Sequence, residues 1–394
     1  MSHKATLPVA DNHSPTRIPT RILHVTFNMG FGGTEQVIRQ LVINLDPQRF
    51  RCEIACIDGE VGAIGKAMEA DNGITIHSRK RGPGLDWKTI RWLRRLIKSG
   101  RFDFVHCHQY SPYTYGWFAH WGTGAKVVFT EHGRFHPDQH RKKARLINPI
   151  IALSSHRLVA ISAATREALI EYEYLPASKI AVIYNGITPL TVKEDRKQEL
   201  ITELGIKSGD VVIGTVARLD AVKNQPMMLQ ATRALINQGY KVRLLLVGDG
   251  PERENLEAIT RQLELNSAVI FTGFQSQPAD YLSLMDIFLL PSFTEGTSMT
   301  LLEAMSLGIP TVATRVGGTA EIVEDKETGF LIESDDQEAF TRAIKNLLNQ
   351  PGQRKKMGSA AKARFKDKFS VEQMVDQYQR CYGAKFGSLN HLFF

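Results

Sequence analysis

The sequence predicts an α/β protein in which two doubly wound, Rossmann-like domains face each other across a cleft. Short apolar runs alternate with amphipathic stretches in both halves of the chain, as in parallel sheets covered by helices. The turn-rich segment Tyr184–Pro189 separates the two alternating regions and suits an interdomain hinge. At 394 residues, the chain also exceeds the length at which a single hydrophobic core usually stops growing.

The first half supplies the strands of one sheet. A helix is expected from about Thr34 to Leu45, directly after the first strand and a glycine-rich turn. The expected strands are Arg21–Thr26, Cys52–Ile57, Thr75–His77, Phe104–Cys107, Lys126–Thr130, Arg157–Ala160 and Ile180–Ile183.

The second half repeats the pattern, with a helix from about Gln225 and closing helices at about 336–349, 354–366 and 370–385. Its expected strands are Val211–Val216, Arg243–Val247, Ala268–Thr272, Ile287–Leu290, Thr311–Ala313 and Gly329–Ile332. We therefore expect a flexible leader at 1–19, an N-terminal domain at 20–186, a C-terminal domain at 187–369, and a final helix with a tail at 370–394.

Composition predicts a soluble globular protein, because apolar residues make up 43% of the chain and charged residues 23%. No apolar run reaches 18 residues, so no transmembrane helix is predicted. The leader is polar and lacks the hydrophobic core of a signal peptide. The four cysteines are scattered and form no CxxC, which favours a reduced, cytoplasmic location.

Positive charge is concentrated in the first half. Residues 1–190 hold 25 Lys and Arg against 15 Asp and Glu, a net charge of +10, and residues 191–394 hold the remaining 24 and 26, a net charge of −2. No nucleic-acid-binding module is recognisable in the sequence. An anionic membrane surface or a pyrophosphate-bearing substrate is therefore the expected partner, and nucleic acid is not.

The segment Glu295–Glu303 carries the most specific site signal. It joins an apolar strand to a helix, and its small residues Gly296, Thr297 and Ser298 leave backbone N–H groups free at the helix start. Such groups can hold a phosphate, and the two carboxylates can accept hydrogen bonds from hydroxyls. Together these features suit a nucleotide sugar. Taken alone, the segment would favour the alternative of a capped helix that carries two solvated carboxylates, and the rest of the chain reverses that preference.

Two further loops lie at predicted strand ends. Arg218 and Lys223 follow the strand that ends at Val216, and two cations on one loop can clamp a diphosphate and stabilise it as it departs. The turn at 30–33 contains three glycines, which permit close backbone approach to a phosphate or sugar. Exposed surface cations and a plain strand-to-helix turn are the alternative interpretations.

Three histidines also lie near strand ends. His106 and His108 share one face of a strand, but no third ligand is spaced to complete a metal site, so we expect structural or cleft-lining side chains. His132 follows the next strand and can donate a hydrogen bond to a sugar hydroxyl, or it can be a satisfied loop histidine.

Several chemistries are disfavoured. The chain contains no Asp-x-Asp to hold Mg²⁺ or Mn²⁺, no P-loop, and no recognisable nucleophile with a base. Glu295 and Glu303 lie on one strand-to-helix segment, so they cannot easily flank a glycosidic bond as a hydrolase pair.

Two basic stretches remain. Residues 87–100 form an amphipathic basic pattern with two tryptophans, and residues 133–145 add further cations. Shallow contact with an anionic membrane is one interpretation. A sheet-covering helix with a solvated cationic face is the other.

These residues resemble the retaining GT-B glycosyltransferases of family 4, also called group 1, over about residues 20–385. The match is specific in the C-terminal half, at 217–224, 245–251, 271–274 and 291–310, followed by Gly317-Gly318 and Glu321. It is looser in the N-terminal half, where Gly32-Gly33-Thr34-Glu35 and Thr130–Gly133 correspond. Bacterial enzymes of exopolysaccharide or surface-glycan assembly are the most similar type.

The resemblance implies roles for individual residues. Glu303 would hold the ribose hydroxyls, Glu295 the donor sugar, and Arg218 with Lys223 the diphosphate. His132 would touch the donor sugar, and the final helix would cross back to the N-terminal domain. Backbone contacts to the donor would come from Gly32, Gly33, Phe274, Gln275, Gly296, Thr297, Ser298, Met299 and Thr300.

The sequence thus predicts a metal-independent, retaining glycosyltransferase without a cofactor. Its co-substrate would be a nucleoside-diphosphate sugar, with a UDP-sugar favoured and a GDP-sugar as the alternative. Its acceptor would be a glycan, expected to be lipid-linked, at the inner face of the membrane. A nucleotide-sugar epimerase of the same fold and a catalytically silent glycan-binding subunit are the alternatives. The sugar, the acceptor linkage and the oligomeric state are not encoded in recognisable motifs.

Overall fold

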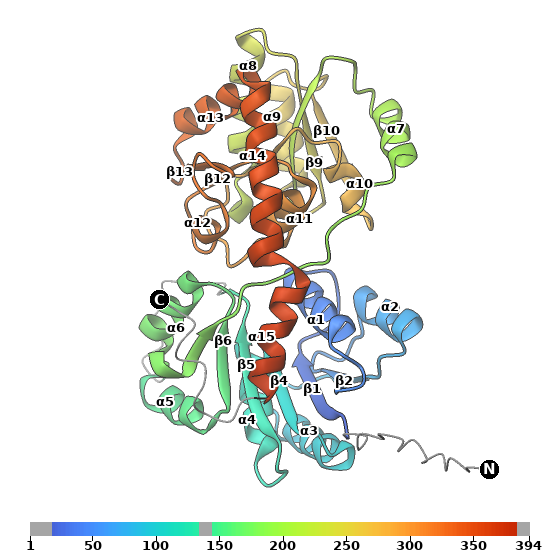
Figure 1. Ribbon diagram of the computed structural model, residues 1–394, viewed down its shortest axis with the longest axis vertical. Coiled ribbons are helices and arrows are strands. Elements are labelled where there is room, and N and C mark those ends of the chain that lie inside the picture. Colours follow the sequence, from blue (N-terminus) through green and yellow to red (C-terminus); the bar gives the residue numbers. More distant parts are fainter. Residues whose placement is uncertain (1–17, 134–143, 384–394) are drawn as a thin grey trace, which may run out of the picture.

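Two parallel β-sheets, one in each domain, organise the computed structural model, which describes residues 18–133 and 144–383 (Figure 1). Helices cover both faces of each sheet, so the expected fold of two doubly wound α/β domains is confirmed. The leader up to residue 17, most of the basic stretch 133–145 and the tail after residue 383 lie outside the described residues.

The N-terminal sheet has the strand order β3-β2-β1-β4-β5-β6-β7, and all of its strand pairs are parallel. Almost every residue of its central strands is buried, as is typical of parallel sheets covered on both faces. The strands are β1 (Thr20–Thr26), β2 (Phe50–Cys56), β3 (Ile76–Ser78), β4 (Phe104–His108), β5 (Lys126–Glu131), β6 (Arg157–Ala160) and β7 (Ile180–Val182).

Six α-helices and one short 3₁₀ turn connect these strands in the described residues. Asp86 and Ser162 cap α3 and α6 by accepting hydrogen bonds from first-turn N–H groups. The elements are α1 (Gly33–Asn44), α2 (Ala63–Asn72), α3 (Trp87–Gly100), α4 (Tyr110–His120), α5 (Ala144–Ser154), α6 (Ala163–Glu173) and η1 (Ala177–Lys179).

The C-terminal sheet has the order β10-β9-β8-β11-β12-β13 and is also parallel throughout. Its strands are β8 (Val211–Val216), β9 (Val242–Val247), β10 (Val269–Gly273), β11 (Ile287–Leu290), β12 (Thr311–Thr314) and β13 (Gly329–Ile332). Its helical elements are α7 (Glu194–Glu203), η2 (Ala221–Lys223), α8 (Gln225–Asn237), α9 (Arg253–Gln262), α10 (Pro278–Leu282), α11 (Met299–Leu307), α12 (Thr319–Ile322), α13 (Gln337–Asn349) and α14 (Pro351–Arg364).

The chain crosses between the domains twice, at two segments that lie side by side. The hinge residue Ile187 accepts a hydrogen bond from Val371 N–H at 3.0 Å and donates one to Phe369. A Cβ on Gly186 would lie 2.3 Å from the carbonyl oxygen of Ser370, so this approach requires glycine. Figure 1 shows α14 of the upper domain leading into the final helix in the lower one.

The end of the chain differs in detail from the expected helices. Helix α14 begins at Pro351, a residue favoured in the first turn, rather than near 354. It continues into a π-helical turn, η3 (Phe365–Phe369), before α15 (Val371–Gly383) begins. Tyr378 and Tyr382 of α15 are buried against the N-terminal domain. None of the helices in the described ranges is long and apolar enough to cross a membrane.

Candidate active site

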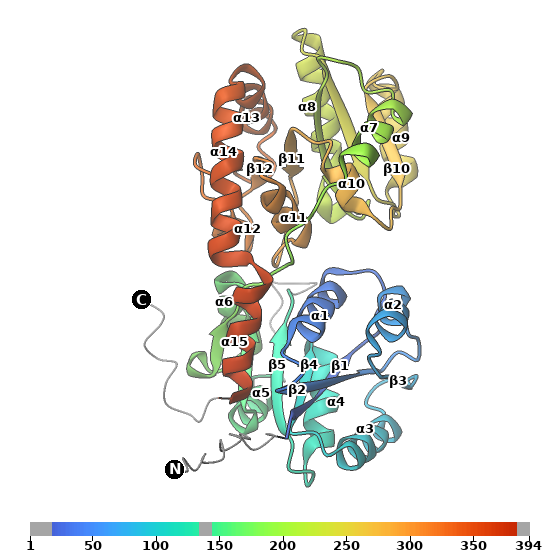
Figure 2. The same ribbon diagram turned by 45° about the vertical axis from the view of Figure 1, so that its right-hand side comes forward.

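The loops that carry the predicted site residues meet between the two sheets. In each sheet the strand order reverses between two neighbouring strands, β1 and β4 in one and β8 and β11 in the other. Ligands of doubly wound sheets bind outside the carboxyl ends of the strands at such points. Figure 2 shows α1, which follows β1, at the top of the N-terminal domain, and α11, which follows β11, at the bottom of the C-terminal domain.

Two helices begin on opposite sides of this cleft. Helix α1 starts after Gly32, which has no side-chain cap, and α11 starts after Ser298, whose hydroxyl accepts from the N–H of Leu301. A Cβ on Gly33 would lie 3.6 Å from Cγ of Met299, so the two helix starts are in contact. Because helix N-termini carry partial positive charge and unpaired N–H groups, this pair can hold a diphosphate between the domains.

The turn before α11 also touches the N-terminal domain. The hydroxyl of Thr297 donates to the carbonyl oxygen of Ile161 at 3.0 Å, and Thr300 Oγ1 lies 3.2 Å from Ser298 Oγ. A Cβ on Gly296 would lie 2.9 Å from the carbonyl oxygen of His132. A side chain at 296 would therefore push the two walls of the cleft apart.

Lys223 and Glu295 form an ion pair on the C-terminal wall. Lys223 Nζ lies 2.6 Å from Glu295 Oε1, and Ser292 Oγ donates to the same oxygen at 2.7 Å. The Glu295 side chain is only 8% exposed, so this pair is largely shielded from solvent. An ammonium held in this way is positioned to move its hydrogen bonds onto an entering phosphate.

Arg218 does not share this arrangement. Its side chain is 69% exposed, and its Nε lies 3.8 Å from Asp220 Oδ2. The predicted pair of cations is therefore not assembled as a clamp in this structure, because Lys223 is bound to Glu295 while Arg218 extends into solvent.

Glu303 is a buried carboxyl group that lacks a partner at one oxygen. It lies in the middle of α11, and its Oε2 has no hydrogen-bond partner among the described residues. Burial raises the pKa of this carboxyl to about 7. Buried polar atoms are normally hydrogen-bonded, so an orphaned oxygen at a cleft indicates a site for a ligand that brings donors, such as vicinal hydroxyls.

His132 is partly buried and continues a row of buried histidines on the N-terminal wall. Its Nε2 lies 2.9 Å from Nδ1 of His108, whose Nε2 lies 3.0 Å from Nδ1 of His24. The expectation that no third ligand is spaced to join His106 and His108 was wrong, because His24 on β1 lies directly beside His106 in the parallel register. The sequence signal that could have identified His24 was its position near the end of the first strand.

The three side chains His24, His106 and His108 bring their ring nitrogens close enough together to group around a metal ion. Both nitrogens of His106 are, however, bound to oxygens: Nδ1 to Tyr382 at 2.7 Å and Nε2 to Thr130 at 2.8 Å. The observed contacts describe a hydrogen-bonded network rather than an open ligand set.

The loop predicted to contact the donor through the backbone of Phe274 and Gln275 carries an aromatic contact across the cleft. Phe274, which follows β10, packs edge-on against Phe31 of the glycine-rich turn with ring centroids 4.6 Å apart. Both rings remain about half exposed. Gln275 is turned back, and its amide donates to the carbonyl of Thr272 at 2.8 Å.

Glu321 is an interdomain contact that motif analysis left without a role. Its two carboxylate oxygens accept from the N–H groups of Ala163 and Ala164 at 2.7 and 2.8 Å, at the start of α6, and from the hydroxyl of Tyr184 at 2.8 Å. A carboxylate at a helix N-terminus is stabilising. This contact ties the C-terminal domain to the N-terminal domain beside the hinge.

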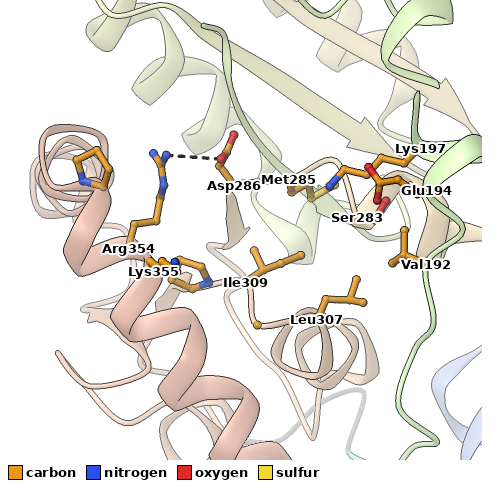
Figure 3. Close-up of a pocket in the computed structure, with 13 residues that line it drawn as sticks. Val192, Glu194, Lys197, Ser283, Met285, Asp286, Leu307, Ile309, Arg354 and Lys355 are labelled. Carbon is orange, nitrogen blue, oxygen red and sulfur yellow. Dashed lines mark ion pairs between the residues drawn. The ribbon is translucent and has the colours of Figure 1, made fainter. Parts of the chain in front are cut away.

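A separate pocket of about 400 Å³ lies on the C-terminal domain (Figure 3). It contains none of the predicted donor-binding residues. Asp286 and Pro310 in its lining precede β11 and β12, so the pocket lies at the amino ends of the strands, opposite the cleft. Arg354 reaches Asp286 across it at 3.6 Å.

Family models match both halves of the chain. The model for glycosyl transferases group 1 matches residues 196–364, which include Lys223, Glu295 and Glu303, and the model for glycosyltransferase family 4 matches residues 31–189, which include His132. The chain belongs to the group 1, family 4 glycosyltransferases. The two models together take in both walls of the cleft described above.

Individual relatives of this glycosyltransferase are moderately similar. N-acetyl-alpha-D-glucosaminyl L-malate synthase of Bacillus anthracis is 29% identical over 238 residues, which are 60% of this chain and 62% of the synthase. UDP-Gal:alpha-D-GlcNAc-diphosphoundecaprenol alpha-1,3-galactosyltransferase of Escherichia coli is 29% identical over 272 residues, which are 66% of this chain and 70% of that enzyme. The matched region thus spans about two thirds of each relative.

Solved structures share the architecture over nearly the whole chain. Anabaena HepE in complex with UDP aligns with a TM-score of 0.79 and 21% identity, covering 93% of this chain and all of that one. Its complex with UDP-glucose aligns with a TM-score of 0.79 and 20% identity, covering 92% and 99%. These alignments confirm the GT-B fold of the glycosyltransferase.

Proposed function

We propose that this glycosyltransferase moves a sugar, with retention of configuration, from a nucleoside diphosphate to a glycan acceptor in polysaccharide or surface-glycan biosynthesis. The observation that carries the proposal is the unpartnered, buried Oε2 of Glu303 beside the contacting starts of α1 and α11. Helix α11 thereby offers an acceptor for ribose hydroxyls and, together with the start of α1, a binding site for a diphosphate. UDP is the favoured nucleotide, in keeping with the UDP complexes of the structural neighbour.

The chemical step proposed for this cleft is leaving-group departure with positioning of the acceptor. The bond between the sugar's anomeric carbon and the β-phosphate oxygen breaks, and its electron pair stays on the phosphate. Lys223 and the two helix starts stabilise that charge, and Arg218 moves from solvent onto the diphosphate. The acceptor hydroxyl attacks from the same face, and its proton passes to the departing phosphate oxygen.

We also propose that transfer needs no divalent metal, because the protein's own groups supply positive charge at the diphosphate. The starts of α1 and α11, which carry partial positive charge, are in contact, and Lys223 is bound to Glu295 in the loop that leads to α11. Chelation with EDTA should leave turnover unchanged. A loss of turnover that Mg²⁺ or Mn²⁺ restores would contradict this part of the proposal.

The acceptor is proposed to be lipid-linked, because the N-terminal domain exposes an apolar helix face. Leu146, Ile147, Ile150 and Leu153 of α5 are 78%, 55%, 64% and 63% exposed. Their spacing places them along one side of the helix. We refer to them as the α5 face. An exposed apolar strip of this kind is typical of helices that lie in a membrane interface.

Aromatic side chains continue the α5 face toward α3. Trp117 donates its indole N–H to Ser154 at the end of α5, and its ring lies 4.9 Å from that of Phe118. Phe118 in turn lies 5.5 Å from Trp87, the first residue of α3. Trp87 and Trp121 are both about half exposed, as expected for aromatic residues at a membrane–water boundary. Figures 1 and 2 place α3, α4 and α5 in the lower part of the N-terminal domain.

Helix α3 contributes charge rather than apolar surface. Its apolar residues Ile90, Leu93 and Ile97 are buried, so of the two sequence-based interpretations the sheet-covering helix is correct for its apolar face. The guanidinium of Arg94 donates a hydrogen bond to the carbonyl oxygen of Phe118 at 2.8 Å. The remaining cations, Lys88, Arg91, Arg95 and Lys98, are exposed and suit anionic lipid headgroups.

Vesicle sedimentation tests the membrane contact. The full chain should bind vesicles that contain phosphatidylglycerol and bind neutral phosphatidylcholine vesicles weakly. The double variant Leu146→Ser, Ile150→Ser should remove most of the binding, and charge reversal of Arg91 and Arg95 should remove its dependence on anionic lipid. Charge reversal of Lys207, an exposed loop cation of the other domain, is the matched control. Unchanged sedimentation of the double variant would contradict the contact.

Calorimetric titration tests the donor. UDP, GDP and ADP, each with and without a panel of attached sugars, should give micromolar binding of one nucleotide that tightens with one sugar. That result identifies the donor for transfer assays with lipid-linked acceptors. Absence of binding in a folded sample would contradict the proposal and favour a catalytically silent glycan-binding subunit.

A further inference from the structure

Three histidines form a linear hydrogen-bonded chain behind the donor side of the cleft. His24 Nδ1 meets His108 Nε2 at 3.0 Å, and His108 Nδ1 meets His132 Nε2 at 2.9 Å. The two terminal nitrogens, His24 Nε2 and His132 Nδ1, are buried and have no partner among the described residues. The chain thus has one free end in the interior, on β1, and one free end on the loop that touches Gly296.

All three imidazoles are neutral at physiological pH. Burial lowers the pKa of His24 and of His132 to about 3, and burial together with the neighbouring histidines lowers the pKa of His108 well below its usual value. No carboxylate is hydrogen-bonded to any of the three rings in the described residues. A neutral imidazole has one N–H donor and one acceptor nitrogen.

These constraints leave two arrangements of protons for the whole chain. In the first, His24 donates to His108, His108 donates to His132, and His132 carries its proton on Nδ1. In the second, every donor and acceptor is exchanged, so His132 has a bare Nδ1 and His24 has an unpaired N–H at Nε2. The ring of His108 can donate at only one nitrogen, so the two hydrogen bonds cannot be reversed independently.

Without a ligand, each arrangement leaves one unpaired N–H, because His24 Nε2 and His132 Nδ1 are both buried and unpartnered. Once a donor sugar pairs with His132 Nδ1, only the interior end distinguishes the two arrangements. The first arrangement leaves an unpaired acceptor at His24 Nε2, and the second leaves an unpaired N–H there. Among backbone groups, orphaned buried N–H groups are rarer than under-satisfied acceptors, and we apply the same preference to the imidazole. At the cleft end, a sugar hydroxyl can serve either as acceptor or as donor, so this end does not favour either proton arrangement.

We propose that His24 and His108 are positioning residues that fix His132 as the Nδ1–H tautomer, so that His132 donates a hydrogen bond to an oxygen of the donor sugar and cannot act as a base. This inference rests on the proposed function, because it assumes that the sugar lies against His132. If His132 cannot act as a base, the proton of the acceptor hydroxyl must go to another group, in agreement with its proposed transfer to the departing phosphate oxygen.

A second network on the same face supports the geometry of this chain. His106 packs against His108 with ring centroids 4.2 Å apart. Tyr382 of α15 holds Nδ1 of His106, and Thr130 holds its Nε2. The C-terminal helix therefore helps to fix the ring orientation of His108 without joining the chain itself.

Nitrogen-15 NMR of the full chain with labelled imidazoles tests the tautomer directly. In the wild type with the donor bound, His132 Nδ1 and His24 Nδ1 should give protonated-nitrogen signals, and His132 Nε2 and His24 Nε2 should give bare-nitrogen signals. A wild-type His132 protonated at Nε2, or an equal mixture of tautomers, would overturn the proposal. The wild-type spectrum needs no variant and therefore does not depend on a mutant's folding.

Two isosteric variants sharpen the test. His24→Asn keeps an N–H that can donate to His108 and should preserve the wild-type tautomer. His24→Asp offers only acceptor oxygens and should reverse the whole chain. Relative to His24→Asn, it should lower kcat about tenfold, the effect of one hydrogen bond, with the UDP Kd unchanged. The same His132 tautomer in both variants would overturn the proposal.

The outcomes separate this inference from the proposed function. If the wild type binds no nucleotide sugar, the proposed function fails whatever the tautomer. If donor binding and transfer occur but His24→Asp matches His24→Asn in kcat and in His132 tautomer, only the role of the histidine chain fails.

Discussion

The N-terminal and C-terminal walls of the cleft differ in how their polar groups are held. The N-terminal wall presents histidines that burial keeps neutral and that bind one another or neighbouring hydroxyls. The C-terminal wall presents an ion pair, Lys223 with Glu295, and the single carboxyl of Glu303. The first wall is suited to orient a neutral sugar, and the second to bind a charged nucleotide.

The neutral, buried histidines of the N-terminal wall should make the free energy of unfolding depend on pH in the acid range. Because burial lowers the pKa of His24 and His132 to about 3 and that of His106 and His108 well below 6.5, the folded histidines resist protonation while the unfolded ones do not. Stability should therefore fall as the pH drops below about 6.5, by up to ~1.4 kcal/mol per pH unit for each histidine.

Thermal unfolding between pH 7.5 and pH 5 measures this slope. The variant His24→Asn should have a shallower slope than the wild type because it removes one of the buried histidines. Identical slopes would show that these side chains titrate normally in the folded protein.

On the opposite wall, Lys223→Ala should cause the largest loss of activity. It removes the partly exposed ammonium proposed to stabilise the departing diphosphate and leaves Glu295 without its ion-pair partner. Loss of one such group lowers kcat by about 10²–10³. Steady-state transfer assays measure the change, with Lys207→Ala on an exposed loop as the matched control. A kcat within threefold of the wild type would remove Lys223 from the mechanism.

Glu303→Gln should make the ligand-free protein more stable while weakening donor binding. With a folded pKa of about 7 against 4.5 unfolded, the buried carboxyl costs stability as the pH rises from 4.5 to 7, and the cost is complete above pH 7. The variant should gain about 3 kcal/mol at pH 8 and nothing below pH 4.5.

Denaturant titrations at pH 8 and pH 4.5 check the stability change, and calorimetry with the donor checks affinity. Since ribose hydroxyls donate to the ionised carboxylate, wild-type affinity should also weaken as the pH falls below 7. A gain in stability of equal size at both pH values would contradict this account of Glu303.

The smallest effect is expected where the two walls are joined. Glu321→Gln keeps one acceptor oxygen for Ala163 and Tyr184, replaces the oxygen that accepts from Ala164 with an NH2 group, and removes the negative charge at the start of α6. The expected loss is about 1 kcal/mol in a denaturant titration. A loss above 3 kcal/mol would mean that this contact, rather than the crossing segments, holds the domains together.

Sequence patterns predicted the fold well because the parallel strands here are short apolar runs bounded by turn-forming or polar residues. Each expected strand has a counterpart within two residues at either end, as at β8 and β11. The start of α14 was misplaced because the pattern gave no weight to Pro351 as a first-turn residue. Hydrophobic periodicity does not predict helix ends that are set by capping residues or by a π turn.

The site was predictable where one segment carries several groups and less so where distant segments meet. Glu295 and Glu303 are on adjoining elements, so a local motif located both. The partner of His132 is His108 on β4, and only the strand order brings His24 of β1 beside that strand. The exposed α5 face was missed because an apolar helix pattern does not reveal whether the apolar side is covered.

A crystal structure of the protein with UDP is the most direct test of the division between the two walls. The account predicts the ribose hydroxyls on Glu303 and the diphosphate between the starts of α1 and α11, with Lys223 in contact. UDP bound chiefly by the histidine wall, or in the pocket beside Arg354, would contradict it.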